Sequence, residues 1–490
     1  MRQFEVIFIS FPGNLGNLVP TVQFARHLTN RDPRFSATIL MIDICERPLV
    51  NAYIHSCAAS SPHINFHHLP PVDPPSPDQY QSSLGYFCLL VEKHRPHVKQ
   101  VITKLLNPTE LESESNSVRV AALFVDMFCT SMIDVARELG VPCYLFFASP
   151  ASFLRFMLHL PTLEAQLATD YTLDPKTELL VPKDPAAVLT IPGFTNALPP
   201  SVLPTRVLKK KNDGYFWFLH HAGRYTETDG LVVNTFRELE QHAVDSLCNG
   251  EFPPVYPIGP IVDLAGPAQW HPDRAGHESI INWLDGQTPS SVVFLCFGSL
   301  GSLSVDQLRE IATGLNRAQI RFIWSIREPP KETLDLPGEY KSLQEILPDG
   351  LVDELEGIGK ICGWVPQSKI LGHEAVGGFV SHCGWNSVLE SLWFGVRIAA
   401  WPLYAEQQMN AFQLVKESKM AVEIRLEYRE GSDLVLAEEF ERGLKRLMKG
   451  DDEVRKNIKQ TREKSRMAIS ENGSSYRSLG LLIDKLAVNT

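Results

Sequence analysis

The residues from Trp364 to Gln407 read WVPQSKILGHEAVGGFVSHCGWNSVLESLWFGVRIAAWPLYAEQ, and this stretch carries the densest chemical signal in the 490-residue chain. Residues 378–381 predict a buried strand that runs directly into HCGWNS, where a helix is expected to begin near Asn386. Gly384 lets the backbone approach a ligand closely, and the free N–H groups of a first helical turn attract anions. The pattern therefore predicts a diphosphate site that needs no metal, with side chains from His382, Asn386 and Ser387.

Some residues of this stretch also have purely structural interpretations. Ser387 and Glu390 match the S-x-x-E capping box, which would only start a helix. His382 and Cys383 stand at adjacent positions, which is a poor spacing for metal ligands, and no partner motif follows them. The functional interpretation therefore depends on the joint spacing of the whole stretch.

An alternation of strands and helices, as expected for parallel sheets, extends through the second half of the chain. The run SVVFLCF at 291–297 predicts a strand, and Ser304 is expected to cap a helix over 305–317. Further short strands are expected at 321–326, 360–363 and 398–401.

The first half repeats this alternation. Residues 5–11 predict a strand, the turn PGNLGN follows, and a helix is expected over 18–28 with Pro20 in its first turn. A second strand at 120–125 ends at Asp126. After it come an expected helix over 131–139, closed by Gly140, and a strand over 143–147.

A Pro- and Gly-rich segment separates the two halves. Residues 251–277, EFPPVYPIGPIVDLAGPAQWHPDRAGH, have no helical or strand period and are expected to form an interdomain linker. The predicted fold class is α/β, with two doubly wound Rossmann-like domains facing each other across a cleft. The expected segments are an N-terminal domain over 1–250, the linker, a C-terminal domain over 278–465, and a helix over 466–490 that packs back on the N-terminal domain.

Bulk properties exclude several classes of protein. The formal charge of −11 argues against a nucleic-acid or anionic-membrane partner. Nine cysteines without a CxxC pair suit reduced thiols in the cytoplasm. The chain opens on a strand rather than a signal segment, and no apolar run approaches the roughly 18 residues of a membrane helix. The absence of a GxGxxG turn argues against a nucleotide-dependent oxidoreductase.

The stretch from Trp364 to Gln407 resembles the 44-residue signature box of the plant secondary-product UDP-glycosyltransferases, glycosyltransferase family 1. The first turn, the FGS loop at 297–299 and the overall length also fit, so the resemblance covers essentially the whole chain. It implies the GT-B fold, a UDP-sugar donor, a small lipophilic acceptor, no cofactor and no metal. A cytoplasmic, monomeric enzyme without a membrane span is expected.

The resemblance also implies a role for each matched position of the box. Trp364 is expected to stack on the uracil, with Val365 and Gln367 at the uracil edge or ribose, and Glu390 on the ribose hydroxyls. The resemblance implies that Gln407 favours UDP-glucose, because relatives with Gln at this position usually prefer glucose, whereas those with His often take galactose. Arg397 departs from the Pro that the family often has and is read as structural. The remaining donor-binding residues are Ser299, His382, Gly384, Asn386 and Ser387 around the diphosphate, Trp385, Glu406 and Gln407 around the sugar, and Tyr404, for which no part of the donor is specified.

The catalytic pair of the family is only half present. In relatives, a His within Gly-His-Leu after the first strand deprotonates the acceptor, an Asp orients that His, and the displacement inverts the anomeric centre. Asp126 matches the Asp, but Gly16-Asn17-Leu18 stands where the His motif is expected. An Asn amide cannot take up a proton, so the position of the catalytic base is occupied by a residue that cannot act as one.

Several explanations of Asn17 stay open. In the first explanation, the acceptor is already acidic, for example a carboxylic acid or an acidic phenol, and needs no base. In the second, Asp126 itself, or a water held by Asn17 and Asp126, acts as the base. Alternatively, the chain is an impaired or engineered variant, or a UDP-sugar-binding protein without turnover. We favour an active inverting glucosyltransferase that uses UDP-glucose and a phenolic, terpenoid or carboxylic acid acceptor.

The acceptor pocket is expected in the N-terminal domain, where apolar and aromatic segments suit a lipophilic ligand. The candidate pocket residues are Gly16, Phe128, Ser149, Phe153 and Phe156.

Overall fold

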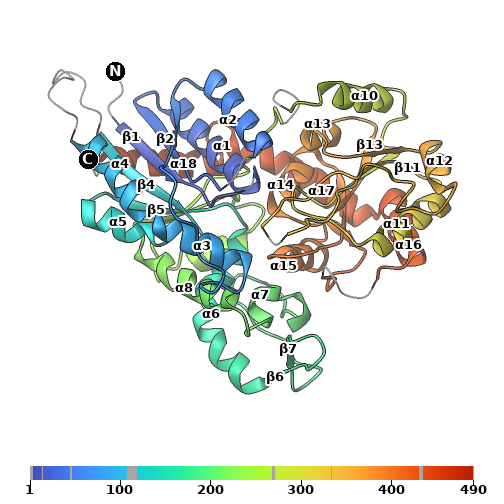
Figure 1. The fold of residues 1–490 in the computed structure, drawn as a ribbon, viewed down its shortest axis with the longest axis horizontal. Coiled ribbons are helices and arrows are strands. Elements are labelled where there is room, and N and C mark those ends of the chain that lie inside the picture. Colours follow the sequence, from blue (N-terminus) through green and yellow to red (C-terminus); the bar gives the residue numbers. More distant parts are fainter. Residues whose placement is uncertain are drawn as a thin grey trace. The chain divides into compact units, whose positions relative to one another are not determined.

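The computed structural model describes residues 4–13, 15–44, 47–107, 119–266, 271–332, 334–429 and 434–488. The chain divides into two compact units (Figure 1). Unit 1 comprises Met1–Thr195, Arg206–Asp263 and Met467–Thr490, and unit 2 comprises Asn196–Thr205 and Leu264–Arg466. The boundary after Asp263 falls inside the predicted linker, of which residues 267–270 lie outside the described part of the chain.

Unit 1 is built on a parallel seven-stranded sheet with the order β3-β2-β1-β4-β5-β8-β9. Its central strands are largely apolar and buried because both faces of the sheet are covered there, and Phe8 and Phe124 stack at 4.8 Å within the core. The strands are β1 (Phe4–Ile9), β2 (Phe35–Met41), β3 (Ile64–His68), β4 (Arg119–Asp126), β5 (Cys143–Phe147), β8 (Gly230–Val233) and β9 (Val255–Pro257). A separate antiparallel hairpin joins β6 (Tyr171–Leu173) and β7 (Leu180–Pro182).

Helices cover this sheet. The longest, α6, packs on both α8 and α9. The helices are α1 (Leu15–Arg31), α2 (Pro48–Ser60), α3 (Ser83–Lys93), α4 (Arg95–Leu106), α5 (Met132–Leu139), α6 (Ala151–Asp170), α7 (Thr205–Leu208), α8 (Asp213–Arg224), α9 (Gln241–Leu247) and α18 (Ser474–Val488). In α18, the hydroxyl of Ser474 donates to Glu238 at 2.7 Å.

Helix α1 corrects one prediction. It begins at Leu15 rather than at residue 18, so Pro20 lies in the second turn and not in the first. The hydroxyl of Thr21, which directly follows Pro20, donates to the carbonyl of Asn17 at 2.9 Å. This carbonyl therefore has a side-chain donor close to the proline, which has no N–H of its own. The earlier start places Asn17 within the first turn of the helix.

Unit 2 contains a second parallel sheet, six-stranded, with the order β12-β11-β10-β13-β14-β15. Phe294 and Phe379 stack at 5.1 Å on one face, while Trp401 and Phe440 pack on the other. The strands are β10 (Val292–Cys296), β11 (Arg321–Ser325), β12 (Lys360–Cys362), β13 (Val376–Ser381), β14 (Arg397–Ala400) and β15 (Ala421–Glu423).

The helices of unit 2 begin with α10 (Arg274–Asp285) and α11 (Val305–Ala318). The predicted cap of α11 is confirmed, since the hydroxyl of Ser304 accepts the N–H of Gln307 at 3.2 Å. The others are α12 (Leu351–Glu356), α13 (Gln367–Leu371), α14 (Trp385–Phe394), α15 (Gln407–Phe412), a π-helical turn (Gln413–Glu417), α16 (Ala437–Lys449) and α17 (Asp452–Ile469).

A short segment groups differently from the sequence expectation. Residues 196–205, placed in the N-terminal domain by the sequence, cluster with unit 2. The guanidinium of Arg429 donates to the hydroxyl of Thr205 at 2.8 Å and to the carbonyls of Ser201 and Leu203 at 2.6 Å each. These contacts hold the segment within unit 2.

Both sheets share one topological feature that positions ligands. In unit 1 the chain runs from β1 to β2 and β3, then returns to β4 on the other side of β1. In unit 2 it runs from β10 to β11 and β12, then returns to β13 on the other side of β10. The carboxyl ends of β1 and β4, and of β10 and β13, are therefore the two switch points where ligands bind in such folds.

Candidate functional site

Loops after three neighbouring strands of unit 2 bring together much of the predicted donor box. Each contains a residue in the left-handed backbone region: Gly298 after β10 (φ 82°), Cys383 after β13 (φ 62°) and Ala405 after β14 (φ 56°). Two of these are not glycine, and such strained backbone is concentrated at functional sites. Gly298 also places the partly exposed Ser299 at this edge of the sheet.

The turn after β13 is held by two hydrogen bonds. The N–H of Cys383 donates to the hydroxyl of Ser381 at 3.1 Å, and the amide of Asn410 donates to the carbonyl of Cys383 at 3.0 Å. Helix α14 then begins at Trp385 with Gly384 as its N-cap, which contributes no capping side chain. The N–H groups of this first turn are suited to an anion.

His382 is buried against two glycines at this turn. Only 6% of the residue is exposed, and a Cβ added to Gly298 or Gly384 would lie 2.5 or 2.4 Å from its Nε2. Burial lowers the pKa of His382 to about 4, so the imidazole is uncharged near neutral pH. It can contribute a hydrogen bond to a ligand without contributing a charge.

A hydrogen-bond network joins α13 to α14. The amide of Gln367 donates to the hydroxyl of Ser387 at 2.9 Å and to the carboxylate of Glu390 at 2.6 Å. The hydroxyl of Ser368, which sequence reasoning missed, donates to the other oxygen of Glu390 at 3.1 Å. The capping-box interpretation is wrong, because α14 begins at Trp385 and Ser387 lies inside the helix. The network fixes the Glu390 carboxylate.

Trp364 follows β12 and is partly exposed. Its backbone N–H donates to Glu339 at 3.1 Å, and its ring stacks on His271; neither partner was expected from the sequence. Val365 is buried in the core cluster that includes Ile370, so its backbone rather than its side chain is the part suited to a ligand.

Gln407 is oriented by the loop before α15. Its side-chain oxygen accepts the backbone N–H groups of Leu403 and Tyr404 at 2.9 and 3.0 Å. Because the oxygen is engaged, the NH₂ end is the donor that Gln407 can offer to a ligand. The ring of Tyr404 lies 6.5 Å from that of His382, and Glu406 is the N-cap of α15.

Two other residues of the box lie in the first turn of α14. Trp385 is buried, and Asn386 follows it as a partly exposed residue of the first turn of α14. Arg397 donates to the carbonyls of Gly377 at 2.9 Å and Met448 at 3.2 Å, which ties β13 to the end of α16 and supports its structural interpretation.

In unit 1, the structure joins the two residues that the sequence predicts as the catalytic pair. The amide nitrogen of Asn17 donates to Asp126 at 3.2 Å, and the other carboxylate oxygen accepts the N–H of Phe128 at 3.0 Å. Asp126 is only 4% exposed. Burial raises its pKa to about 6, although hydrogen bonds from Phe128, Asn17 and Phe11 oppose this shift.

The predicted acceptor residues fall into two groups. Phe128 lies beside the pair, with its ring 5.3 Å from that of Phe11, and the exposed Gly16 directly precedes Asn17. Phe153 and Phe156 are fully buried in α6 and stack on each other at 5.9 Å, and Ser149 is also buried. The structure thus brings Gly16 and Phe128, together with the unanticipated Phe11, close to the pair.

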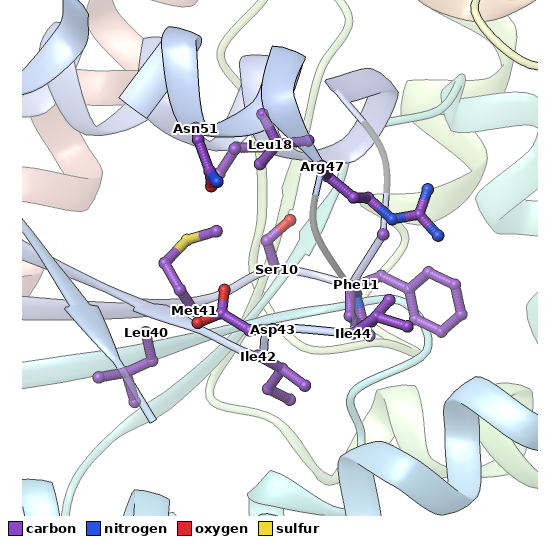
Figure 2. A pocket seen from close by; sticks show the side chains of 13 residues that line it. Ser10, Phe11, Leu18, Leu40, Met41, Ile42, Asp43, Ile44, Arg47 and Asn51 are labelled. Atoms are coloured by element: carbon purple, nitrogen blue, oxygen red, sulfur yellow. The ribbon is translucent and has the colours of Figure 1, made fainter. Parts of the chain in front are cut away.

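A cavity that the sequence did not indicate lies at the carboxyl ends of β1 and β2. It is bordered by Leu18 of α1 and by Arg47 and Asn51 at the start of α2. Figure 2 shows the hydroxyl of Ser10 and the amide of Asn51 pointing into it. The Ser10 hydroxyl is buried and has no hydrogen-bond partner among the described residues.

The described residues contain no metal-binding cluster and no membrane-spanning helix. No group of three His, Cys, Asp or Glu side chains in this part of the chain could hold a metal ion. Within the same residues, no helix is both long and apolar enough to cross a bilayer. All eight cysteines that the structure describes are free.

Comparisons with known proteins agree with this arrangement. Residues 221–460 match the family of UDP-glucoronosyl and UDP-glucosyl transferases. The chain is 53% identical to UDP-glycosyltransferase 43 of Pueraria montana var. lobata, over 99% of this chain and 100% of the relative. It is 43% identical to UDP-glucose flavonoid 3-O-glucosyltransferase 6 of Fragaria ananassa, over 98% of each.

Solved structures give the same result. The crystal structure of Medicago truncatula UGT71G1 complexed with UDP-glucose matches with a TM-score of 0.86 and 42% identity, over 99% of this chain and 98% of that one. A transferase from Siraitia grosvenorii in complex with UDP matches with a TM-score of 0.85 and 41% identity, over 99% and 100%. The chain therefore belongs to the plant UDP-glycosyltransferases of glycosyltransferase family 1 and is an enzyme of the GT-B fold.

Proposed function

We propose that this enzyme transfers glucose from UDP-glucose to a small lipophilic acceptor with inversion of the anomeric centre. The observation that carries the proposal is the set of polar groups at the carboxyl ends of β10, β13 and β14. These groups are uncharged donors beside the first turn of α14, a fixed carboxylate at Glu390, and the oriented amide of Gln407. A nucleoside diphosphate sugar requires all three kinds of group at one site.

Each part of the donor would meet a different part of this site. Uracil stacks on Trp364, and Glu390 accepts hydrogen bonds from the ribose hydroxyls. The diphosphate lies against the N-terminus of α14, where Ser299, His382, Asn386 and Ser387 supply further donors. The helix dipole and these donors take the role that a metal has in other transferases. Trp385, Tyr404, Glu406 and Gln407 surround the sugar.

Gln407 supports glucose as the sugar. Its oxygen is held by two backbone N–H groups, so its NH₂ group is presented in one orientation to the sugar hydroxyls. The relative from Fragaria ananassa is named as a UDP-glucose transferase, and the Medicago truncatula relative was solved with UDP-glucose.

Asn17 and Asp126 position the acceptor in this proposal, but Asn17 takes no proton from it. Above a pH of about 6, Asp126 is ionised and accepts the amide hydrogen of Asn17, which holds the amide in place. Acceptors that are ionised near neutral pH, such as carboxylic acids and acidic phenols, can attack without a base. Weakly acidic alcohols are expected to react slowly.

The experiment is to incubate the protein with UDP-glucose and a panel of phenols, alcohols and carboxylic acids, and to record products by mass spectrometry. A mass gain of one hexose, undiminished by a chelator, supports the proposal. Loss of activity in chelator that magnesium restores would contradict the metal-free mechanism.

A second candidate function follows from Asn17 itself. A chain that lacks the base at this position is also consistent with a UDP-sugar-binding protein without turnover. Tight binding of UDP without product from any acceptor of the panel would favour this second function. A cytoplasmic, monomeric state belongs to the first proposal and is checked by cell fractionation and size-exclusion chromatography.

A further inference from the structure

His271, which lies in the predicted linker, covers one face of Trp364. His271 stacks on Trp364 with ring centroids 5.0 Å apart and an interplanar angle of 13°. His271 also stacks on His277 of α10, at 4.6 Å and 28°. The three rings form a stacked group within unit 2 that connects α10 to the indole.

The imidazole of His271 is fixed in this position by its surroundings. Its Nδ1 accepts the backbone N–H of Asp273 at 3.1 Å, and Asp273 in turn caps α10 by accepting the N–H of Gly276 at 2.9 Å. Only 7% of His271 is exposed. A ring held from two sides in this way is a stable part of the fold rather than a loosely placed loop side chain.

The two histidines add no charge to the stack near neutral pH. Burial is the main cause that lowers the pKa of His271 and of His277. The neighbouring His277 lowers the pKa of His271 further, and Lys369 does the same for His277. The stack therefore consists of uncharged aromatic rings, for which offset stacking with the indole is favourable.

Trp364 is still partly exposed although His271 covers one of its faces. A flat ring has two faces, and base stacking requires only one of them. We propose that His271 is a positioning residue for the nucleobase of the donor: it closes one face of Trp364 and fixes the tilt of the indole, so that uracil stacks on the other face. The inference rests on the proposed role of Trp364 in holding the donor.

This role predicts an effect on donor binding and none on the chemical step. His271 would act only through Trp364, so its loss should raise the KM for UDP-glucose and the Kd for UDP while kcat stays unchanged. A purely structural residue would instead lower the thermal stability and affect kcat and KM together.

The test is a calorimetric titration of UDP into His271→Ala, His271→Leu and His271→Phe. Removal of the aromatic ring in the Ala and Leu variants should weaken UDP binding by roughly 2- to 10-fold, the range expected for one aromatic pair. His271→Phe should restore the affinity to within about twofold, because it keeps a flat ring against the indole. Equal affinity in all three variants and the wild type, or tighter binding by the Ala variant, would overturn the proposal.

A matched control is available in the same unit. His373 accepts the N–H of Ala375 through Nδ1 at 3.2 Å, just as His271 accepts that of Asp273, but its Nε2 pairs with Asp285. His373→Ala should leave UDP binding unchanged. Equal weakening by His373→Ala and His271→Ala would show a general structural effect and would also overturn the proposal.

Trp364→Ala distinguishes failure of the proposed donor site from failure of the proposed role of His271. If this variant binds UDP as tightly as the wild type, the proposed donor site is wrong. If Trp364→Ala weakens binding but His271→Ala does not, only the role of His271 is wrong. In the double variant, loss of His271 should add little to the loss of Trp364, because one acts through the other.

Discussion

The switch point between β1 and β4 in unit 1 and that between β10 and β13 in unit 2 can be compared directly. Each lies at the carboxyl ends of two adjacent parallel strands, and each is followed by the first turn of a helix. In unit 1 that turn carries Asn17, which bonds Asp126 at the end of β4. In unit 2 it carries Asn386 and Ser387, and His382 lies at the end of β13.

The difference lies in the polar groups. At the switch point of unit 2, several of the residues that we propose to hold the donor are fixed by hydrogen bonds to neighbours. At the switch point of unit 1, the amide of Asn17 and the carboxylate of Asp126 form a hydrogen-bonded pair, and the amide cannot take up a proton. Under our proposal, donor binding depends on unit 2 and proton transfer from the acceptor depends on unit 1, so the two can change independently.

The largest expected effect is on turnover. Asn17→His should raise the rate on weakly acidic phenols and alcohols by about 10²- to 10⁴-fold, because a positioned general base contributes that much. Asn and His have similar reach, so the introduced imidazole could bond Asp126 as the amide of Asn17 does. The measurement is kcat for a phenol and for a carboxylic acid, and the gain should be much smaller for the acid.

Asp126→Ala in the Asn17→His background is the control for this prediction. It should remove most of the gain, because the imidazole would lose its orienting carboxylate. Unchanged or lower rates in Asn17→His alone would mean that another group is the base.

The next effect is on stability. The pKa of Asp126 is about 6 in the folded chain, against roughly 3.9 in the unfolded chain. Between pH values of about 4 and 6, the folded state therefore binds the Asp126 proton more tightly than the unfolded state does. The contribution of Asp126 to stability therefore falls as the pH rises from about 4 to about 6, and stays low above that.

Asp126→Asn should remove this pH dependence and stabilise the protein at pH 8 by up to about 3 kcal/mol. Denaturant unfolding of the wild type and the variant at several pH values checks this. Parallel stability curves for the two proteins across the window would contradict the raised pKa.

A smaller effect is expected at the glycines beside His382. In Gly298→Ala, the new Cβ would lie 2.5 Å from Nε2 of His382 on a backbone with φ 82°, so the variant should weaken UDP-glucose binding by about 1–3 kcal/mol. Gly350→Ala is the matched control, because Gly350 has φ 76° in the same unit but open space around its Cβ position. Equal donor affinity in both variants would mean that crowding of His382 does not affect donor binding and would contradict this prediction.

The smallest expected effect is at Gln407, where we expect a change in glucose transfer and almost none in UDP binding. Gln407→Glu keeps an oxygen for the N–H groups of Leu403 and Tyr404 but replaces the NH₂ donor. UDP binding should stay nearly unchanged, while kcat/KM for glucose transfer falls by about 2- to 10-fold, as for one lost hydrogen bond. A comparable loss of UDP affinity would mean that Gln407 does not act on the sugar.

Much of the fold was predictable because its signals are local. A continuous apolar run that ends at Asp126 identified β4, and Ser304 before a periodic segment identified the start of α11. Local signals were also misleading in two places. Pro20 suggested a helix that starts too late, and Ser387 with Glu390 suggested a cap inside α14.

The parts of the site that escaped prediction are made by contacts between distant residues. Gln367 meets Glu390 only because α13 and α14, which precede and follow β13 in the chain, pack against each other. His271 meets Trp364 across more than 90 residues, from a segment without any periodic pattern. Residue spacing along the chain cannot report such pairs, because they depend on how the strands are ordered.

The most direct test of the separation between binding and proton transfer is a calorimetric titration of UDP-glucose into the wild type, Asn17→His and Trp364→Ala. We expect the wild type and Asn17→His to bind with the same Kd, whereas Trp364→Ala should bind about 5- to 150-fold more weakly because base stacking is lost. A wild type that does not bind UDP-glucose, or an Asn17→His variant whose Kd changes as much as that of Trp364→Ala, would contradict this expectation.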